Sequence, residues 1–377
     1  MKKLLLYSDS QHVGGHEIQA FNALKLLKDK YHLIVVVNSD NRYFIDLLET
    51  LNVDLVKVNY ASSRLQFIRS FFSWKMIYEN YRLIKSFKPN LILNVQGNIE
   101  LGSVMLLSAK LSGVKVITYI PICHFLSEVT NRPVIGRVKD LLNCIYYRMV
   151  DGYITLNNFN VDLIRKRGVN CPISVVSNGI NFTIGNSENM VQITEKLNIN
   201  VNKINIALVG RVQFWHKGHD ILISMVDKYR NQLKNYQFII VGTGEDLDRF
   251  QLRISKLGLD EYFQLMGHIK DLSEVYTAID GVIIPSRFES GAGTPLVLLE
   301  SIIQKLPVIM SKLPEMESYL GGQHLFEVGD IDGIFKLLQS ILSVKKQELD
   351  RRFDFVVNQH DMKKFQLDFL NAIEDFL

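Results

Sequence analysis

The sequence predicts an α/β protein built from two doubly wound parallel sheets. At 377 residues the chain is long for a single hydrophobic core and suits two domains of ordinary size. Short apolar runs alternate with longer segments of helical period along the whole chain, and these runs fall into two sets of six. Hydrophobic residues make up 47% and charged residues 22%, an ordinary globular composition that argues against extensive disorder.

The apolar runs define the expected strands in chain order. In the first half they are 3–8, 32–38, 54–59, 91–96, 114–120 and 152–157. In the second half they are 204–210, 236–242, 262–267, 281–286, 306–311 and 324–329. Helical segments fit between them, as in 17–29, where apolar residues recur at roughly the helical period.

A segment containing Pro172 and the pair Asn178-Gly179 separates the two sets and is the predicted linker. We therefore expect a first Rossmann-like domain over 1–176 and a second over 177–355. The C-terminal helix over 356–377 is expected to pack back toward the first domain. Two such domains facing a central cleft would bring the carboxyl ends of their strands to the place where these folds bind ligands.

Composition narrows the class of partner. A net charge of +4 argues against a nucleic-acid binder but allows weak attraction to an anionic membrane. The three cysteines have no paired short spacing, so neither a zinc site nor a disulfide framework is indicated. The first apolar run ends at Tyr7, too early for a signal peptide, and no run approaches 18 apolar residues. We therefore expect a cytoplasmic protein.

Two glycine motifs follow predicted strands. Gly14 and Gly15 lie where the first strand turns into a helix, so a ligand could approach their backbone; the alternative is an ordinary tight turn. Gly242 and Gly244 resemble a fragment of the dinucleotide fingerprint, but the third glycine is missing, so they are weak evidence for NAD.

Two cations follow the strand at 204–210. Arg211 lies directly past the strand end, and Lys217 follows after a short loop. Arginine engages two oxygens at once and lysine acts as a point charge, so this pair would suit a diphosphate. The alternative is that both are solvated surface charges.

A glycine-bearing loop and the helix behind it form a further candidate. Gly291 and Gly293 would expose backbone N–H groups, and Thr294 is expected to cap a helix beginning near Pro295, which together make an anion site. Glu300 shares an apolar face of that helix, where a carboxylate needs hydrogen-bond donors such as ribose hydroxyls. Alternatively, Glu300 lies at the helix edge and reaches water. Together with the two cations, these features predict a nucleotide diphosphate site.

Six motifs span the chain in a specific order. They are Gly14-Gly15-x-Glu17, "SNGIN" (177–181), "VGR…KGHD" (209–220), "IIVGTGED" (239–246), "LMGHIKD…VYTAIDGVIIPSRFES" (265–290) and "PLVLLES…LPVI" (295–309). In this order and spacing they resemble the glycosyltransferases of family 4, retaining enzymes with two Rossmann-like domains, the GT-B fold.

The resemblance implies a role for several residues. Arg211 and Lys217 would hold the donor's diphosphate, Glu300 would bind its ribose, and the backbone near Ile269 its base. His124 follows a predicted strand at its carboxyl end and would lie near the transferred sugar; the alternative is a core or surface histidine.

The chain departs from the family pattern at one glutamate. The family places seven residues between its paired glutamates, which would put the first at position 292, an alanine here. Glu289 lies three residues earlier, and we expect it still to reach the transferred sugar. The spacing from Arg211 to Lys217 is also one residue longer than usual.

The predicted reaction transfers a sugar from a nucleotide-diphosphate sugar to an acceptor hydroxyl with retained configuration and without a metal or other cofactor. The protein would stabilise the departing diphosphate electrostatically, and the leaving phosphate would accept the acceptor's proton. The resemblance suggests bacterial surface polysaccharide or glycolipid assembly, with a saccharide or lipid-linked saccharide as acceptor, bound mainly by the first domain.

Two basic and apolar stretches, 55–78 and 132–150, would suit an anionic membrane at the inner face of the cell membrane. The alternative is that their aromatic residues belong to the core. Two other classes of function remain open. A dinucleotide-dependent oxidoreductase requires a complete glycine fingerprint, which is not found, and a non-catalytic nucleotide-sugar binder would suit the displaced Glu289.

Overall fold

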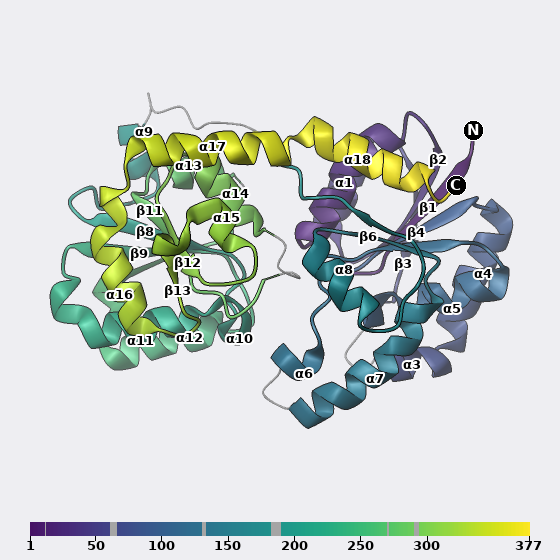
Figure 1. Cartoon of the computed structure of the whole chain (residues 1–377), viewed down its shortest axis with the longest axis horizontal. Coiled ribbons are helices and arrows are strands. Elements are labelled where there is room, and N and C mark those ends of the chain that lie inside the picture. The colour runs from purple at the N-terminus through teal and green to yellow at the C-terminus, as the bar shows by residue number, and fades with distance from the viewer. Residues whose placement is uncertain (12, 61–65, 130–132, 182–189, 270, 290–293) are drawn as a thin grey trace. The chain divides into compact units, whose positions relative to one another are not determined.

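The computed structural model describes residues 1–11, 13–60, 66–129, 133–181, 190–269, 271–289 and 294–377 (Figure 1). These residues form two compact units. The first comprises Met1–Gly179 together with Met362–Leu377, and the second comprises Ile180–Asp361. Each unit is a Rossmann-like parallel sheet with helices on both faces, so the predicted fold class is confirmed.

The first unit contains a seven-stranded sheet in the order β3-β2-β1-β4-β5-β6-β7. Its strands are β1 (Lys3–Ser8), β2 (His32–Asn38), β3 (Asp54–Val58), β4 (Leu91–Val95), β5 (Val116–Tyr119), β6 (Gly152–Thr155) and β7 (Ile173–Val175). All neighbouring strands in this sheet run parallel. The strand order reverses between β1 and β4, so the loops that follow these two strands lie at the usual ligand-binding edge of a doubly wound sheet.

Helices cover both faces of the first sheet. They are α1 (Gly15–Leu27), α2 (Arg42–Glu49), α3 (Gln66–Arg69), η1 (Ser70–Phe72), α4 (Trp74–Phe87), η2 (Ile99–Gly102), α5 (Ser103–Ser112), α6 (Leu126–Val129), α7 (Pro133–Met149), α8 (Asn158–Arg165) and α18 (Met362–Glu374). The last helix, α18, lies beside α1 (Figure 1) and buries Phe369 against Tyr119 of β5, with ring centroids 5.4 Å apart.

The second unit contains a six-stranded parallel sheet in the order β10-β9-β8-β11-β12-β13. Its strands are β8 (Ile204–Val209), β9 (Tyr236–Val241), β10 (Phe263–Gly267), β11 (Gly281–Ile284), β12 (Val308–Ser311) and β13 (Leu325–Phe326). Its helices are α9 (Met190–Lys196), α10 (Phe214–Lys217), α11 (His219–Tyr229), η4 (Arg230–Gln232), α12 (Leu247–Leu257), η5 (Asp260–Tyr262), α13 (Leu272–Thr277), α14 (Leu296–Ile303), α15 (Met316–Leu320), η7 (Gly322–His324), α16 (Ile331–Ser340), η8 (Ile341–Ser343) and α17 (Lys346–His360).

Two apolar clusters sandwich this second sheet. One cluster joins it to α11, α12 and α16, and the other joins it to α13, α14, α15 and α17. The central strand β11 is apolar throughout because it is buried on both faces, and β9 becomes wholly apolar from Phe238, where its burial begins.

The expected count of six strands in the first half is wrong, because β7 lies inside the segment assigned to the linker. This three-residue strand follows Pro172 and pairs with β6, and it is too short to give a clear apolar run. The units divide after Gly179 and Asp361 rather than after residues 176 and 355. Gly179 belongs to the first unit because the side-chain amide of Gln19 binds its backbone N–H and carbonyl, at 3.0 and 2.9 Å.

Candidate active site

The loop from β8 into α10 carries both predicted cations. Arg211 is exposed to solvent, while Lys217, at the end of α10, has a side chain only 19% exposed. The ammonium of Lys217 donates to both carboxylate oxygens of Glu289, at 2.7 and 2.8 Å. The structure therefore joins two residues that the sequence places 72 positions apart.

Glu289 is buried, with 4% of its surface exposed. It also accepts a hydrogen bond from Ser286, which follows β11. Burial is the largest single effect on the pKa of Glu289 and raises it, but the charge of Lys217, the influence of His216 and the hydrogen bonds from Lys217 and Ser286 together outweigh burial and hold the pKa below its ordinary value. A small cavity lined by Lys217, Ser286, Glu289 and Pro295 lies beside this ion pair.

His216 is a third member of the cluster that sequence reasoning missed. Its ring stacks on Phe288, with centroids 4.4 Å apart, and its Nε2 lies 4.0 Å from Glu289. Burial, together with the charge of Lys217, lowers the pKa of His216 to about 4, so the ring is neutral at neutral pH. His216 could have been selected from the sequence because it directly precedes Lys217. Ser286 could have been selected because it follows a predicted strand.

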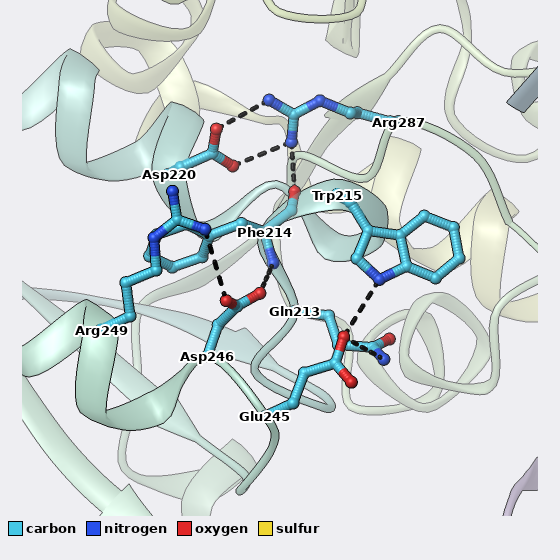
Figure 2. Close-up of polar contacts among 8 residues, drawn as sticks. All are labelled: Gln213, Phe214, Trp215, Asp220, Glu245, Asp246, Arg249 and Arg287. Carbon is cyan, nitrogen blue, oxygen red and sulfur yellow. Dashed lines mark hydrogen bonds and ion pairs between the residues drawn. The ribbon is translucent and has the colours of Figure 1, made fainter. Parts of the chain in front are cut away.

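A set of polar contacts holds the loop that carries these residues (Figure 2). The N–H of Phe214 donates to Asp246 at 2.7 Å, and its carbonyl accepts from the guanidinium of Arg287. Arg287 also binds both oxygens of Asp220 at 2.8 Å. Both backbone groups of Phe214 are thus bound, and α10 begins from a defined position.

The opposite side of the same loop is bound by Glu245 (Figure 2). This carboxylate accepts from the indole N–H of Trp215 at 3.2 Å and from the amide of Gln213 at 3.4 Å. Arg249 in turn lies 3.6 Å from Asp246. The side chains that shape the loop come from α11, α12 and the segments following β9 and β11, so tertiary packing sets its conformation.

The two glycines after β9 have a structural explanation. A Cβ on Gly242 would lie 2.0 Å from the carbonyl oxygen of Gly210, and one on Gly244 would lie 2.3 Å from that of Val212. These glycines let the segment after β9 pack directly on the segment after β8, so the short glycine motif needs no NAD to explain it.

Glu300 lies on α14, half-buried. It accepts a hydrogen bond from the hydroxyl of Tyr276 on α13 at 2.7 Å. Burial raises the pKa of Glu300, and the hydrogen bond from Tyr276 opposes that rise only in part. The predicted cap was wrong, because Pro295 rather than Thr294 occupies the N-cap position of α14. Pro295 restricts the preceding backbone, and Thr294 lies next to the hydroxyl of Tyr319 instead.

The remaining predicted donor residues are placed only in part. Gly291 and Gly293 lie outside the described residues. Ile269 is half-buried against the apolar cluster that includes α13 and α14.

In the first unit, Gly14 and Gly15 form the turn from β1 into α1. The N–H of Gly14 donates to the buried carboxylate of Glu17 at 2.7 Å, closing a capping box. Glu17 also lies 2.8 Å from Nε2 of His16 and 3.4 Å from the hydroxyl of Ser8. This turn is therefore held by a carboxylate that is wholly inside the protein.

His124 follows β5 at its carboxyl end, as expected, and is half-buried. Its carbonyl accepts from the guanidinium of Arg167 at 2.9 Å. That guanidinium lies over the rings of Phe125 and Tyr147, 3.9 and 4.5 Å from their centroids. The buried Arg167 thus anchors the segment that carries His124.

The described residues contain neither a cluster of potential metal ligands nor a helix suited to span a membrane. In those parts of the chain, no group of three His, Cys, Asp or Glu side chains is arranged to hold a metal ion. None of the helices formed by the described residues is both long and apolar enough to cross a bilayer.

Comparison with known proteins identifies the chain. Residues 190–354 match the model for glycosyl transferases group 1, and residues 13–183 match that for Glycosyltransferase Family 4. A glycosyltransferase is therefore the class that fold and site define. The chain belongs to the family 4 glycosyltransferases of the GT-B fold.

Individual relatives are more distant. Protein CapJ of Staphylococcus aureus is 28% identical over 165 residues, which span 42% of this chain and only 41% of CapJ. HepE of Anabaena, solved with UDP and glucose, has a TM-score of 0.79 at 15% identity, over 99% of this chain and 100% of HepE. The lipopolysaccharide outer core galactosyltransferase WaaB has a TM-score of 0.68 at 18% identity, with both chains wholly covered. Identities this low relate the folds alone.

Proposed function

We propose that the enzyme transfers a hexose from a nucleotide-diphosphate sugar to an acceptor hydroxyl, with retained configuration at the anomeric carbon. The observation that carries this proposal is the buried Lys217–Glu289 pair beside the strand ends of the second sheet. A lysine held at a defined point, with the exposed Arg211 on the same loop, supplies positive charge for a departing diphosphate.

Each residue of the second unit has a role in this proposal. Arg211 and Lys217 bind the diphosphate and stabilise the negative charge that develops as the bond to the sugar breaks. Glu289, which already orients Lys217, contacts the transferred sugar. Glu300 accepts hydrogen bonds from the ribose hydroxyls, and the backbone near Ile269 contacts the base. The leaving phosphate takes the acceptor's proton, and no metal ion or other cofactor takes part.

In the first unit, Gly14 and Gly15 allow close approach of the donor, and His124 contacts the sugar. We infer that this unit also binds a saccharide or lipid-linked saccharide acceptor. Two solved structures similar to this chain support the direction of this inference: WaaB is a lipopolysaccharide outer core galactosyltransferase, and HepE was solved with UDP and glucose. We therefore place the enzyme in surface polysaccharide or glycolipid assembly, at the inner face of the cell membrane.

Thermal stabilisation by UDP, GDP, ADP and NAD tests the donor site. A ligand that binds only the folded protein at 100 times its Kd stabilises it by about 2.7 kcal/mol. We expect UDP to raise the Tm of the wild type, and to raise that of Glu300→Ala much less. The matched control is Glu327→Ala, since Glu327 is an exposed carboxylate of the same unit. Stabilisation by NAD alone, or by none of the four, would overturn the donor assignment.

Two product assays test the chemistry. Hydrolysis of the sugar donor that fits the stabilising nucleotide, measured with and without EDTA, should give equal rates if no metal takes part. Proton NMR of the freshly released sugar should show the anomeric configuration of the donor; the opposite configuration contradicts retention.

A further inference from the structure

Trp215 is a large aromatic side chain left half exposed beside the ion pair of the second unit. It belongs to α10, whose last residue is Lys217, and 48% of its surface is exposed. A tryptophan offers a large apolar area, and burial of the exposed half against a ligand would be favourable. A single exposed apolar residue is ordinary on a protein surface, so exposure by itself indicates no site.

The ring of Trp215 is, however, held from two sides. Its indole N–H donates to Oε1 of Glu245 at 3.2 Å, and the buried amide of Gln213 donates to the same oxygen at 3.4 Å (Figure 2). Its ring centroid lies 5.1 Å from that of Phe288 and 5.6 Å from that of His216. A side chain already held in one orientation loses little conformational entropy when a ligand stacks on it. Trp215 is therefore preorganised for stacking although half of it faces solvent.

Glu245 adds an unused hydrogen-bond acceptor at the edge of this ring. Both hydrogen bonds that it accepts go to Oε1, and no hydrogen bond joins Oε2 to the residues that the structure describes (Figure 2). The side chain is exposed, so a ligand can reach Oε2. Each oxygen of an ionised carboxylate can accept about two hydrogen bonds.

An exposed aromatic ring beside an open carboxylate oxygen matches the chemistry of a pyranose. One face of a pyranose presents C–H groups, whose partial positive charge suits the negative face of an indole ring. Its hydroxyl groups lie around the rim of the ring and donate hydrogen bonds to a carboxylate. Ligand sites combine aromatic contact area with a few polar groups in this way. We propose that Trp215 and Glu245 form a subsite for one pyranose ring, which stacks on the indole and donates to Oε2 of Glu245.

The surroundings of this subsite favour the acceptor over the donor. The ring of His216 stacks on Phe288, and Nε2 of His216 lies 4.0 Å from Glu289, the residue proposed to contact the transferred sugar. Trp215 contacts both rings of this stacked pair, so it lies one side chain away from Glu289. A pyranose on Trp215 would then lie next to the transferred sugar, as an acceptor must. The assignment to the acceptor rests on the proposed function, whereas binding of a saccharide at Trp215 does not.

The fluorescence of Trp215 tests the subsite directly. The chain has two tryptophans, so in a Trp74→Phe background the emission comes from Trp215 alone. The full chain is titrated, with and without UDP, with the methyl glucosides and methyl galactosides of both anomeric configurations. Glycerol controls for hydroxyl groups without a ring, and uridine tests whether a nucleotide base occupies the indole. Glu245→Gln keeps an oxygen for the indole N–H, and its matched control is Glu327→Gln, which changes an exposed carboxylate of the same unit.

We expect at least one methyl glycoside to change the emission in a saturable way, and glycerol and uridine to leave it unchanged. Glu245→Gln should raise the apparent Kd about tenfold, because an ionised acceptor forms stronger hydrogen bonds than an amide, whereas Glu327→Gln should not change it. A Kd unaffected by Glu245→Gln would contradict the subsite, and so would silence with every glycoside. A response to uridine would assign the ring to the base, and a response to UDP-glucose without one to any methyl glycoside would assign it to the donor.

Saturation-transfer NMR with the responding glycoside gives a second readout that does not need the tryptophan. Trp215→Leu should weaken binding at least about tenfold, and Trp215→Phe, which keeps a smaller ring, should weaken it less. Circular dichroism and the Tm verify that each variant is folded, and equal binding by Trp215→Leu and the wild type would overturn the stacking. Hydrolysis of the sugar donor is measured separately. An enzyme that binds the glycoside but hydrolyses no donor would refute the proposed function and leave the subsite standing, and the converse result would refute the subsite alone.

Discussion

Replacing Lys217 by methionine should destabilise the second unit markedly. The substitution keeps an unbranched side chain that is one atom shorter, and it leaves the carboxylate of Glu289, 4% exposed, without its cation. Removing one partner of a buried ion pair costs about 3–5 kcal/mol. Because the side chain of Lys217 is itself 19% exposed, we expect the lower end, about 3 kcal/mol. For a unit of this size that corresponds to a fall in Tm of about 6–12 °C.

The pH dependence of this loss gives a second, independent signature. In the wild type the pKa of Glu289 is lowered, so its charge contributes stability above the unfolded pKa, and that contribution is lost as the pH falls through the folded pKa. Without Lys217, burial should raise the pKa of Glu289 instead. The loss of stability in Lys217→Met should therefore be greatest at neutral pH and shrink toward pH 4, as protonation removes the isolated charge.

Urea unfolding followed by tryptophan fluorescence measures both effects. The chain has two tryptophans, one in each unit, so a Trp74→Phe background leaves Trp215 as the reporter of the second unit. The double variant Lys217→Met/Glu289→Gln should recover much of the loss, because no charge stays buried. Lys312→Met, which breaks an exposed pair, should cost less than about 1 kcal/mol. Additive losses in the double variant, or a loss independent of pH, would refute the reasoning.

Three further predictions concern residues around the same site. His216→Phe keeps the stacked ring but removes the titrating group. Since the pKa of His216 is lowered to about 4, the free energy of unfolding of the wild type falls as the pH drops from 6.5 to 4, and in His216→Phe this fall should be smaller by about 3 kcal/mol. Asp246→Ala removes the acceptor for the N–H of Phe214 and should weaken UDP stabilisation about tenfold in apparent Kd, whereas Asp246→Asn, which keeps an acceptor oxygen, should have a smaller effect. In urea unfolding, Gly242→Ala should lower the free energy of unfolding by at least about 3 kcal/mol. Gly258→Ala, whose added Cβ meets no neighbouring atom, should lower it by about 1 kcal/mol; equal losses would contradict the packing argument.

The strands of both sheets could be predicted closely because buried parallel strands are continuous apolar runs. β1 and β2 begin and end at the expected residues, 3–8 and 32–38. The strand β7 could not be predicted, because three residues following a proline carry too little apolar pattern. The boundary at Gly179 depends on a hydrogen-bonded contact with Gln19, 160 residues earlier.

The candidate site also has a part that the sequence could predict and a part that it could not. Arg211, Lys217, Glu289 and Glu300 could be selected from the sequence, because each follows a strand or occupies a helix of recognisable pattern. Their partners could not be selected. The contact of Lys217 with Glu289 and that of Glu300 with Tyr276 join separate elements.

The sequence by itself determined the two parallel sheets, the motif order and hence the family, since these depend on local periodicity and spacing. Only the tertiary structure decided which charges are paired and what the glycines after β9 accommodate. The physical reason is that burial, and the contacts that compensate buried charge, depend on residues brought together from distant parts of the chain.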